Sequence, residues 1–231
     1  MAEFNHARKE ITFKLVYYGP ALSGKTTNLQ MIHQGAGTDS TGELMTLNTE
    51  GDRTLFFDML PVRMKTASGF SIRLKLFTVP GQVQHNSTRK IVLRGSDGIV
   101  FVADSSAAVS KQNAESFDNL RKNLKEIGRS LADTPLVVQF NKRDLPDAVP
   151  EDMIQKSWGQ SGIPTTLAVA MKGEGVVETF EALAEQLYDS LDKKYEFARK
   201  FNLTREDFLA AMHANFAPGD GGAESSGAQD A

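Results

Sequence analysis

The sequence predicts an α/β fold in which a mostly parallel β-sheet of six strands carries helices on both faces. Short apolar runs typical of buried strands recur along the chain, and segments with apolar residues at helical spacing lie between them. Strands that alternate with helices favour a parallel sheet covered on both sides. Ligands of such sheets bind beyond the carboxyl ends of the strands, and the polar motifs of this chain follow its predicted strands.

Six segments are predicted as strands and four as helices. The strands are residues 10–18, 54–66, 70–79, 98–104, 135–141 and 164–170, with a hairpin turn expected at 67–69. The helices are residues 26–34, 111–131, 175–201 and 205–216. The polar, glycine-interrupted stretch 36–53 is predicted as a long loop, and such loops in compact domains are often functional.

Composition narrows the class of protein. The chain has 231 residues, 40% hydrophobic and 24% charged, which fits one globular domain with an appended segment. A net charge of -3 gives no electrostatic reason to expect nucleic acid as a partner. The absence of cysteine excludes disulfides, thiolate metal sites and prenyl anchors. No apolar run is long enough for an integral membrane segment, so a cytoplasmic protein is expected.

The first motif is "GPALSGKT", Gly19 to Thr26, which follows a predicted strand and precedes a predicted helix. It fits a phosphate loop, because a glycine-permissive turn can aim several backbone N–H groups at a phosphate chain and the helix N-terminus adds its dipole. Lys25 would reach the β- and γ-phosphates, and the Thr26 hydroxyl would ligate magnesium. The alternative is a tight glycine turn with a surface lysine. The predicted nucleotide contacts in this loop are Gly19, Ala21, Leu22, Ser23, Gly24, Lys25, Thr26 and Thr27.

The second motif is "NKRD", which directly follows the apolar strand that ends at residue 141. The Asp144 carboxylate can accept hydrogen bonds from two guanine N–H donors that adenine lacks. Asn141 would tie this loop to the phosphate loop, and the Lys142 stem can cover a ring face. A solvated turn is the alternative, but the phosphate loop and this motif together predict a guanine-nucleotide site. Ala170, after the last predicted strand, is a candidate N–H donor to the guanine O6.

With these residues in place, the chain resembles the small Ras-like GTPases. Among them it resembles the MglA family of bacterial polarity and gliding-motility GTPases. The shared stretches are "KLVYYGPALSGKTTNL", "RTLFFDMLP", "TVPGQVQHNSTRKIVLRG", "DGIVFVADS" and "NKRDLPDA". The resemblance covers roughly residues 10–190. It implies a Ras-like P-loop GTPase fold for a domain of residues 1–194, with GTP or GDP and Mg²⁺ as cofactors.

The segment "TVPGQ" departs from the Ras-like pattern Asp-x-x-Gly-Gln, because Thr78 stands where a magnesium-linked aspartate is expected. A neutral threonine gives a weaker field at the metal, and Asp52 and Asp58 are nearby carboxylates that could compensate. Gly81 can donate its N–H to the γ-phosphate, which only the triphosphate offers. Gln82 matches the glutamine that orients the attacking water. An ordinary β-turn is the alternative interpretation.

The end of the long loop holds two further candidates. The resemblance implies that Thr54 ligates magnesium when the γ-phosphate is present and that Arg53 is an intrinsic arginine finger. An arginine supplied within the chain can neutralise charge on the transferring phosphoryl group. The alternative for Arg53 is a surface arginine at the start of a strand.

Three functions compete at this point. The first is a hydrolysing switch that recruits partners in its GTP state. The second is a scaffold that binds guanine nucleotide but hydrolyses little GTP. The third is an ATP-using enzyme, which the motif "NKRD" disfavours. The resemblance implies slow hydrolysis by a monomer, stimulated by a roadblock-type activating protein like MglB. It also implies effectors on the switch face, a role in cell polarity or motility, and a cytoplasmic location with concentration at a cell pole.

The chain beyond residue 194 lies outside the resemblance. Residues 195–216 are predicted as a helical extension, whose apolar side chains either pack on the domain or bind a partner or a membrane surface. Residues 217–231 contain no aromatic or large aliphatic residue and are predicted to be disordered.

Overall fold

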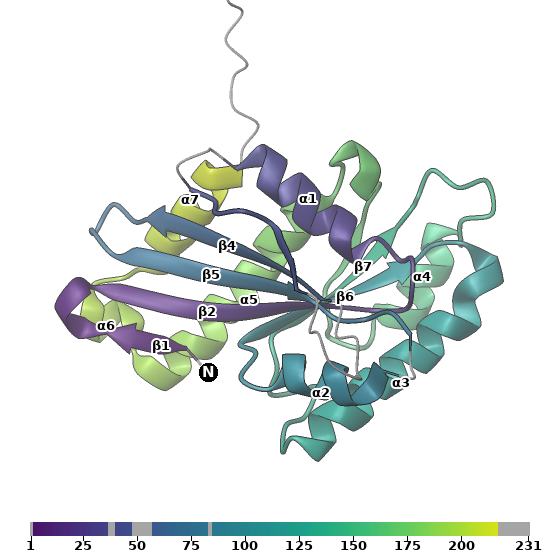
Figure 1. The fold of residues 1–231 in the computed structure, drawn as a ribbon, viewed down its shortest axis with the longest axis horizontal. Helices are drawn as coiled ribbons and strands as arrows, with labels where there is room; N and C mark the ends of the chain where they lie inside the picture. Colours follow the sequence, from purple (N-terminus) through teal and green to yellow (C-terminus); the bar gives the residue numbers. More distant parts are fainter. Residues whose placement is uncertain (1, 37–39, 48–56, 83–84, 217–231) are drawn as a thin grey trace, which may run out of the picture.

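The computed structural model describes residues 2–36, 40–47, 57–82 and 85–216. Their strands form a single sheet with helices packed on both faces, which confirms the predicted fold class (Figure 1). The strands are β1 (Glu3–Asn5), β2 (Glu10–Tyr18), β3 (Met45–Leu47), β4 (Phe57–Lys65), β5 (Ser71–Thr78), β6 (Gly98–Asp104), β7 (Leu136–Asn141) and β8 (Thr165–Leu167).

The sheet has the strand order β3-β4-β5-β2-β6-β7-β8, and β1 pairs with β2 outside this path. The run from β5 to β8 is parallel, whereas β4 and β5 form the expected antiparallel hairpin. The prediction of six strands was wrong by two, because β1 and β3 were not expected. β1 fills the edge of β2 that β6 leaves open, since β6 pairs only from Leu15 onward. β3 lies within the predicted long loop and pairs with β4.

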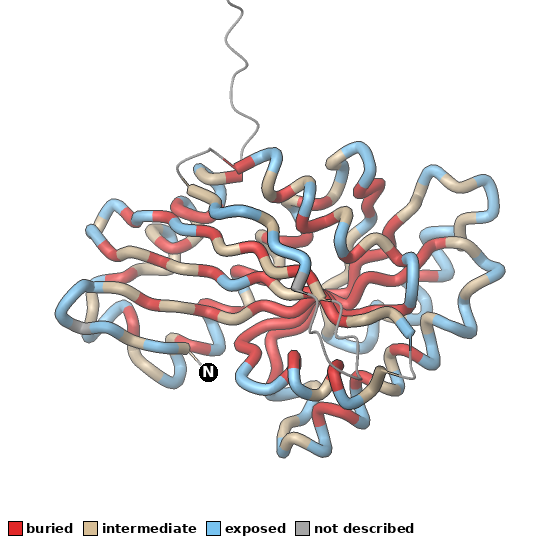
Figure 2. The backbone as a smooth tube through the Cα atoms, viewed as in Figure 1, coloured by how far each residue is buried: buried red, intermediate tan, exposed pale blue. Residues whose placement is uncertain are grey.

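Alternate side chains of β2 are buried on opposite faces of the sheet, as expected for a strand. Phe13, Leu15 and Tyr17 pack on one face with helices α1 (Lys25–Gly35) and α5 (Val176–Tyr195). Val16 and Tyr18 pack on the other face with α2 (Asn86–Leu93), α3 (Ser110–Glu126) and α4 (Glu151–Trp158). Buried residues follow the strands through the middle of the molecule (Figure 2).

The predicted helix 175–201 is two helices. α5 ends at Tyr195, because Glu196 adopts a left-handed backbone conformation with φ of 55°. α6 (Phe197–Phe201) and α7 (Arg205–Phe216) follow it. Helices α2 and α4 were not predicted, since each has only eight residues and a short apolar pattern. Short 3-10 turns occupy His6–Arg8, Ala107–Val109 and Ala170–Lys172.

Helices α6 and α7 pack on the domain rather than presenting an apolar face to solvent. Phe197, Phe208 and Met212 are buried in the same core as β2 and α5. The ring of Phe208 lies 5.9 Å from that of Phe13, and the ring of Phe216 lies 4.6 Å from that of Phe180. A domain boundary at residue 194 stays a prediction. The predicted disordered tail, 217–231, lies outside the described residues. Among the described helices, none is long and apolar enough to cross a membrane.

Candidate nucleotide-binding site

The phosphate-loop motif lies in the turn between β2 and α1, as its sequence predicts. Gly19 has φ of 149°, and a Cβ there would lie 2.2 Å from the carbonyl oxygen of Val102. Gly24 has φ of 98°, and a Cβ there would lie 2.1 Å from Nδ2 of Asn141. The two glycines are therefore required both by backbone conformation and by the closeness of neighbouring strands and loops.

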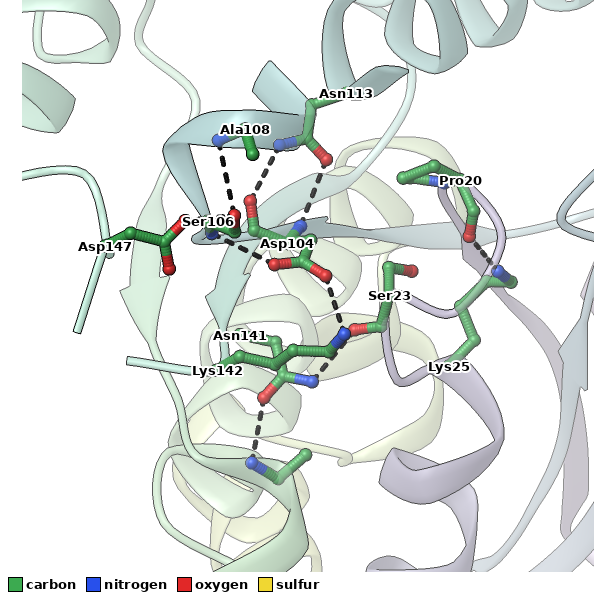
Figure 3. Close-up of polar contacts among 11 residues, drawn as sticks. Pro20, Ser23, Lys25, Asp104, Ser106, Ala108, Asn113, Asn141, Lys142 and Asp147 are labelled. Carbon is green, nitrogen blue, oxygen red and sulfur yellow. Dashed lines mark hydrogen bonds and ion pairs between the residues drawn. The ribbon is translucent and has the colours of Figure 1, made fainter. Parts of the chain in front are cut away.

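Lys25, the first residue of α1, is buried and points back into this turn (Figure 3). Its Nζ donates to the carbonyl oxygens of Pro20 at 2.6 Å and Gly19 at 3.4 Å. The pKa of Lys25 is lowered to about 7, mainly because burial disfavours the charged amine; Arg89 adds to the decrease and Asp58 opposes it. A bound polyanion would reverse this balance, so the electrostatics of the loop fit a phosphate chain.

The remaining residues of the loop differ in exposure. Ala21, Leu22 and Thr26 are exposed, and Leu22 adopts a left-handed conformation with φ of 61°. Ser23 is buried, and its Oγ has no hydrogen-bond partner among the described residues. Thr27 is half-buried. A buried hydroxyl without a partner is costly, so Ser23 marks a position where the loop is suited to a polar ligand.

Asn141, at the end of β7, joins the phosphate loop to the loop after β8. Its Nδ2 donates to the carbonyl oxygen of Ser23 at 2.9 Å, and its Oδ1 accepts from the N–H of Ala170 at 2.8 Å (Figure 3). The structure thus brings the two motifs together, although 117 residues separate Gly24 from Asn141 in the sequence. The Ala170 N–H already has Asn141 as its acceptor, so its predicted bond to a guanine O6 would have to replace this one.

Lys142 and Asp144 lie in the same loop with different surroundings. Lys142 has φ of 64°, and its Nζ forms an ion pair with Oδ2 of Asp104 at 2.6 Å (Figure 3). Asn113 of α3 binds both the N–H and the carbonyl of Asp104, which fixes this partner in place. Asp104 was not predicted as a site residue, although it ends a buried strand that the sequence predicts. Asp144 is exposed, and no described residue donates a hydrogen bond to it.

A carboxylate lies beside the predicted magnesium ligand Thr26. Oδ2 of Asp58 accepts from the hydroxyl of Thr26 at 2.6 Å and from that of Thr78 at 3.1 Å. Its Oδ1 accepts from the hydroxyl of Thr46 at 3.0 Å. Hydroxyl and carboxylate oxygens are ligands that Mg²⁺ accepts, so these residues fit the ion. Among the described residues, no three or more acidic or histidine side chains come together as a candidate metal site.

The "PGQ" segment lies against the phosphate loop. A Cβ on Gly81 would lie 2.3 Å from Cα of Ala21, so the two backbones are in direct contact. Gln82 is exposed and lines a cavity of about 350 Å³ beside this contact, together with Pro20, Ala21, Gly81, Gln112, Glu115 and Ser116. Three other candidates, Arg53, Thr54 and Asp52, lie outside the described residues.

Comparison with known proteins identifies the family. A family model of the ADP-ribosylation factor family matches residues 2–187. The mutual gliding-motility protein MglA of Myxococcus xanthus is 47% identical over 193 residues, which cover 84% of this chain and 99% of that protein. The chain is a Ras-like small GTPase of the MglA family. Its relatives include Rab-5B of Plasmodium falciparum (30% identity; 52% of this chain and 56% of that protein). The small COPII coat GTPase SAR1 of Giardia intestinalis is 28% identical, over 63% of this chain and 65% of that protein.

Membership of the MglA family confirms the resemblance drawn from the motifs. Small GTPases bind GTP or GDP together with Mg²⁺, which agrees with the phosphate loop and with the oxygen ligands beside it. The family model ends at residue 187, before α6 and α7 begin.

Proposed function

We propose that this protein is a molecular switch that binds guanine nucleotides and hydrolyses GTP to GDP and phosphate. The observation that carries the proposal is the pair of hydrogen bonds by which Asn141 joins the phosphate loop to the loop after β8. These two hydrogen bonds connect the predicted base site to the predicted phosphate site, and a nucleotide has to contact both sites at once.

In this proposal Asp58 supplies the carboxylate that Thr78 cannot. Its hydrogen bond to the Thr26 hydroxyl would orient that ligand toward the metal, and a bound Mg²⁺ would neutralise phosphate charge. Thr54 is the proposed second protein ligand of the GTP state. The contacts of Asp58 with Thr26 and Thr78 support this role, whereas Asp52 lies outside the described residues.

Hydrolysis is assigned to Gln82 and Arg53. Gln82 follows Gly81, whose backbone contacts the phosphate loop, and it lines the cavity beside this contact, which supports a role at a terminal phosphate. Its proposed role is to orient the attacking water, and that of Arg53 is to neutralise charge on the transferring group. Without an activating partner the reaction is expected to be slow, on the order of 10⁻⁴ per second.

Guanine selectivity is assigned to Asp144. Its carboxylate is exposed and accepts no hydrogen bond from the described residues, so it is available to the two guanine donors. The Lys142 stem would cover the base while its amine is held by Asp104. Because Ala170 donates to Asn141, the next N–H along the chain, that of Met171, is a second candidate donor to the guanine O6.

The M. xanthus relative, which is named for gliding motility, supports a proposal for the process. We propose a role in motility or cell polarity, in which a roadblock-type, MglB-like activating protein and effectors recognise the switch face of a monomer. A cytoplasmic protein that concentrates at a cell pole fits this role. A guanine-nucleotide scaffold with little hydrolysis is the second candidate, favoured by the replacement of the usual aspartate by Thr78.

Two measurements test the proposal. Nucleotide-stripped protein is titrated with labelled GDP, GTP and ATP in the presence of Mg²⁺, and we expect uptake of both guanine nucleotides but not of ATP. Single-turnover phosphate release is then followed with and without a roadblock-type protein, and stimulation favours the switch over the scaffold. Failure to take up either guanine nucleotide would overturn the whole proposal.

A further inference from the structure

Arg89, on α2, is the largest side chain that is fully buried among the described residues. No acidic residue in the described part of the chain forms an ion pair with it. Burying an unpaired guanidinium is costly unless its N–H groups find acceptors. The groups that accept hydrogen bonds from Arg89 therefore indicate which part of the structure it supports.

The guanidinium binds three backbone carbonyls that belong to the nucleotide site. Nε donates to the oxygen of Pro80 at 2.8 Å, and Nη2 donates to that of Gly81 at 2.5 Å and to that of Gly19 at 3.3 Å. One planar group therefore links the phosphate loop to the segment that carries the proposed γ-phosphate sensor. A lysine amine has no such fork and cannot satisfy several fixed acceptors in one plane.

The opposite edge of the guanidinium is anchored in α3. Nη1 donates to Oδ1 of Asn119 at 2.9 Å, and the group lies over the ring of Tyr18, 4.9 Å from its centroid. Asn119 in turn donates to Oδ1 of Asn86, at the start of α2. These two half-buried amides hold Arg89 from the edge opposite the one that binds the backbone carbonyls of the nucleotide site.

Peptide geometry connects these contacts to function. The Pro80 carbonyl and the Gly81 N–H belong to one planar, trans peptide unit, in which they point in opposite directions. Holding the Pro80 oxygen toward α2 therefore directs the Gly81 N–H away from α2. The Gly81 carbonyl and the Gln82 N–H are related in the same way. By binding both oxygens, Arg89 fixes two successive peptide planes.

We propose that Arg89 is a positioning residue that aims the Gly81 N–H at the terminal phosphate and sets the backbone from which Gln82 reaches the attacking water. The inference rests on the proposed function, because it assigns a role within the same site. It predicts that Arg89 contributes more to the binding of the triphosphate than to that of GDP. A residue that merely fills the core would affect both nucleotides equally.

The test is Arg89→Lys, compared with Arg129→Lys. Arg129 is half-buried and, like Arg89, donates to a backbone carbonyl, that of Ser96, but no hydrogen bond joins it to the nucleotide site. Affinities for GDP and for a non-hydrolysable GTP analogue are measured for both variants, with thermal unfolding as the readout of stability.

In Arg89→Lys we expect the affinity for the analogue to fall at least about tenfold more than that for GDP. Activator-stimulated turnover should fall at saturating activator, whereas Arg129→Lys should keep the wild-type affinity ratio.

The outcomes separate the two proposals. A wild-type protein that takes up neither nucleotide contradicts the proposed function itself. A wild-type protein that binds both, combined with an unchanged affinity ratio in folded Arg89→Lys, overturns the role of Arg89. If Arg89→Lys does not fold, Asn119→Ala replaces it, because this variant keeps the guanidinium but removes its anchor. There the affinity ratio should shift in the same direction, and an unchanged ratio again overturns the inference.

Discussion

Thr78 and Asp58 hydrogen-bond to each other twice across the β4–β5 pairing. The Thr78 hydroxyl donates to the Asp58 carboxylate at 3.1 Å and accepts from the Asp58 N–H at 2.9 Å. The residue that replaces the usual aspartate is thus the direct partner of a carboxylate on the neighbouring strand. That carboxylate also accepts from the proposed magnesium ligand Thr26.

Asp58→Asn is expected to lower the affinity of the nucleotide-bound protein for Mg²⁺ by about 10- to 100-fold, because it removes the charge that orients Thr26. Affinity for GDP is measured over a range of Mg²⁺ concentrations and in EDTA, where the variant and the wild type should converge. Thr78→Asp alone places two carboxylates side by side and should destabilise the fold. The double variant Asp58→Asn with Thr78→Asp should recover the magnesium dependence, and unaltered dependence in Asp58→Asn would rule out its role.

Asp144→Asn is expected to lower the affinity for GDP and GTP by about 100-fold or more, since an amide cannot accept from two guanine donors at once. The same variant should gain affinity for xanthine nucleotides, whose 2-oxo group accepts where guanine donates. Asp147→Asn, three residues further along the same loop, is the matched control. Guanine binding by Asp144→Asn at wild-type strength would show that the base is recognised elsewhere.

Arg53→Ala and Gln82→Ala are each expected to keep GTP binding and lose stimulated hydrolysis. The loss for Arg53 should be about 10³-fold or more, the range typical of an arginine finger. Single-turnover phosphate release with the roadblock-type activator measures the rate, and a separate titration measures binding. Loss of nucleotide binding in either variant would contradict the assigned role.

Phe208→Ala is expected to lower the free energy of unfolding by about 3–5 kcal/mol, because this ring is fully buried against Phe13 and Tyr188. Glu206→Ala, at an exposed position of the same helix, should change it by less than about 0.5 kcal/mol. Urea unfolding of the full chain gives both values. Equal stability of the two variants would mean that α7 does not contribute to the core.

Local patterns in the sequence were sufficient for the central strands of the sheet and for the turn that carries the phosphate-loop motif. Alternation along β2 and the apolar runs of β6 and β7 predicted the central strands, because burial on one or both faces repeats within a few residues. The glycines of the phosphate loop were recognisable because a turn with positive φ requires that residue type.

The tertiary structure alone decided the contacts between distant residues. The register of β4 against β5 places Asp58 beside Thr78, and no local pattern encodes register between strands. The Ala170 N–H donates to Asn141. Strand β1 pairs with the part of β2 that β6 leaves unpaired. Arg89 lies in α2, which was not predicted, and no local pattern indicates that its side chain is buried. Only the packing of α2, α3 and the phosphate loop around it makes its guanidinium a buried link, since burial and partners are properties of the assembled fold.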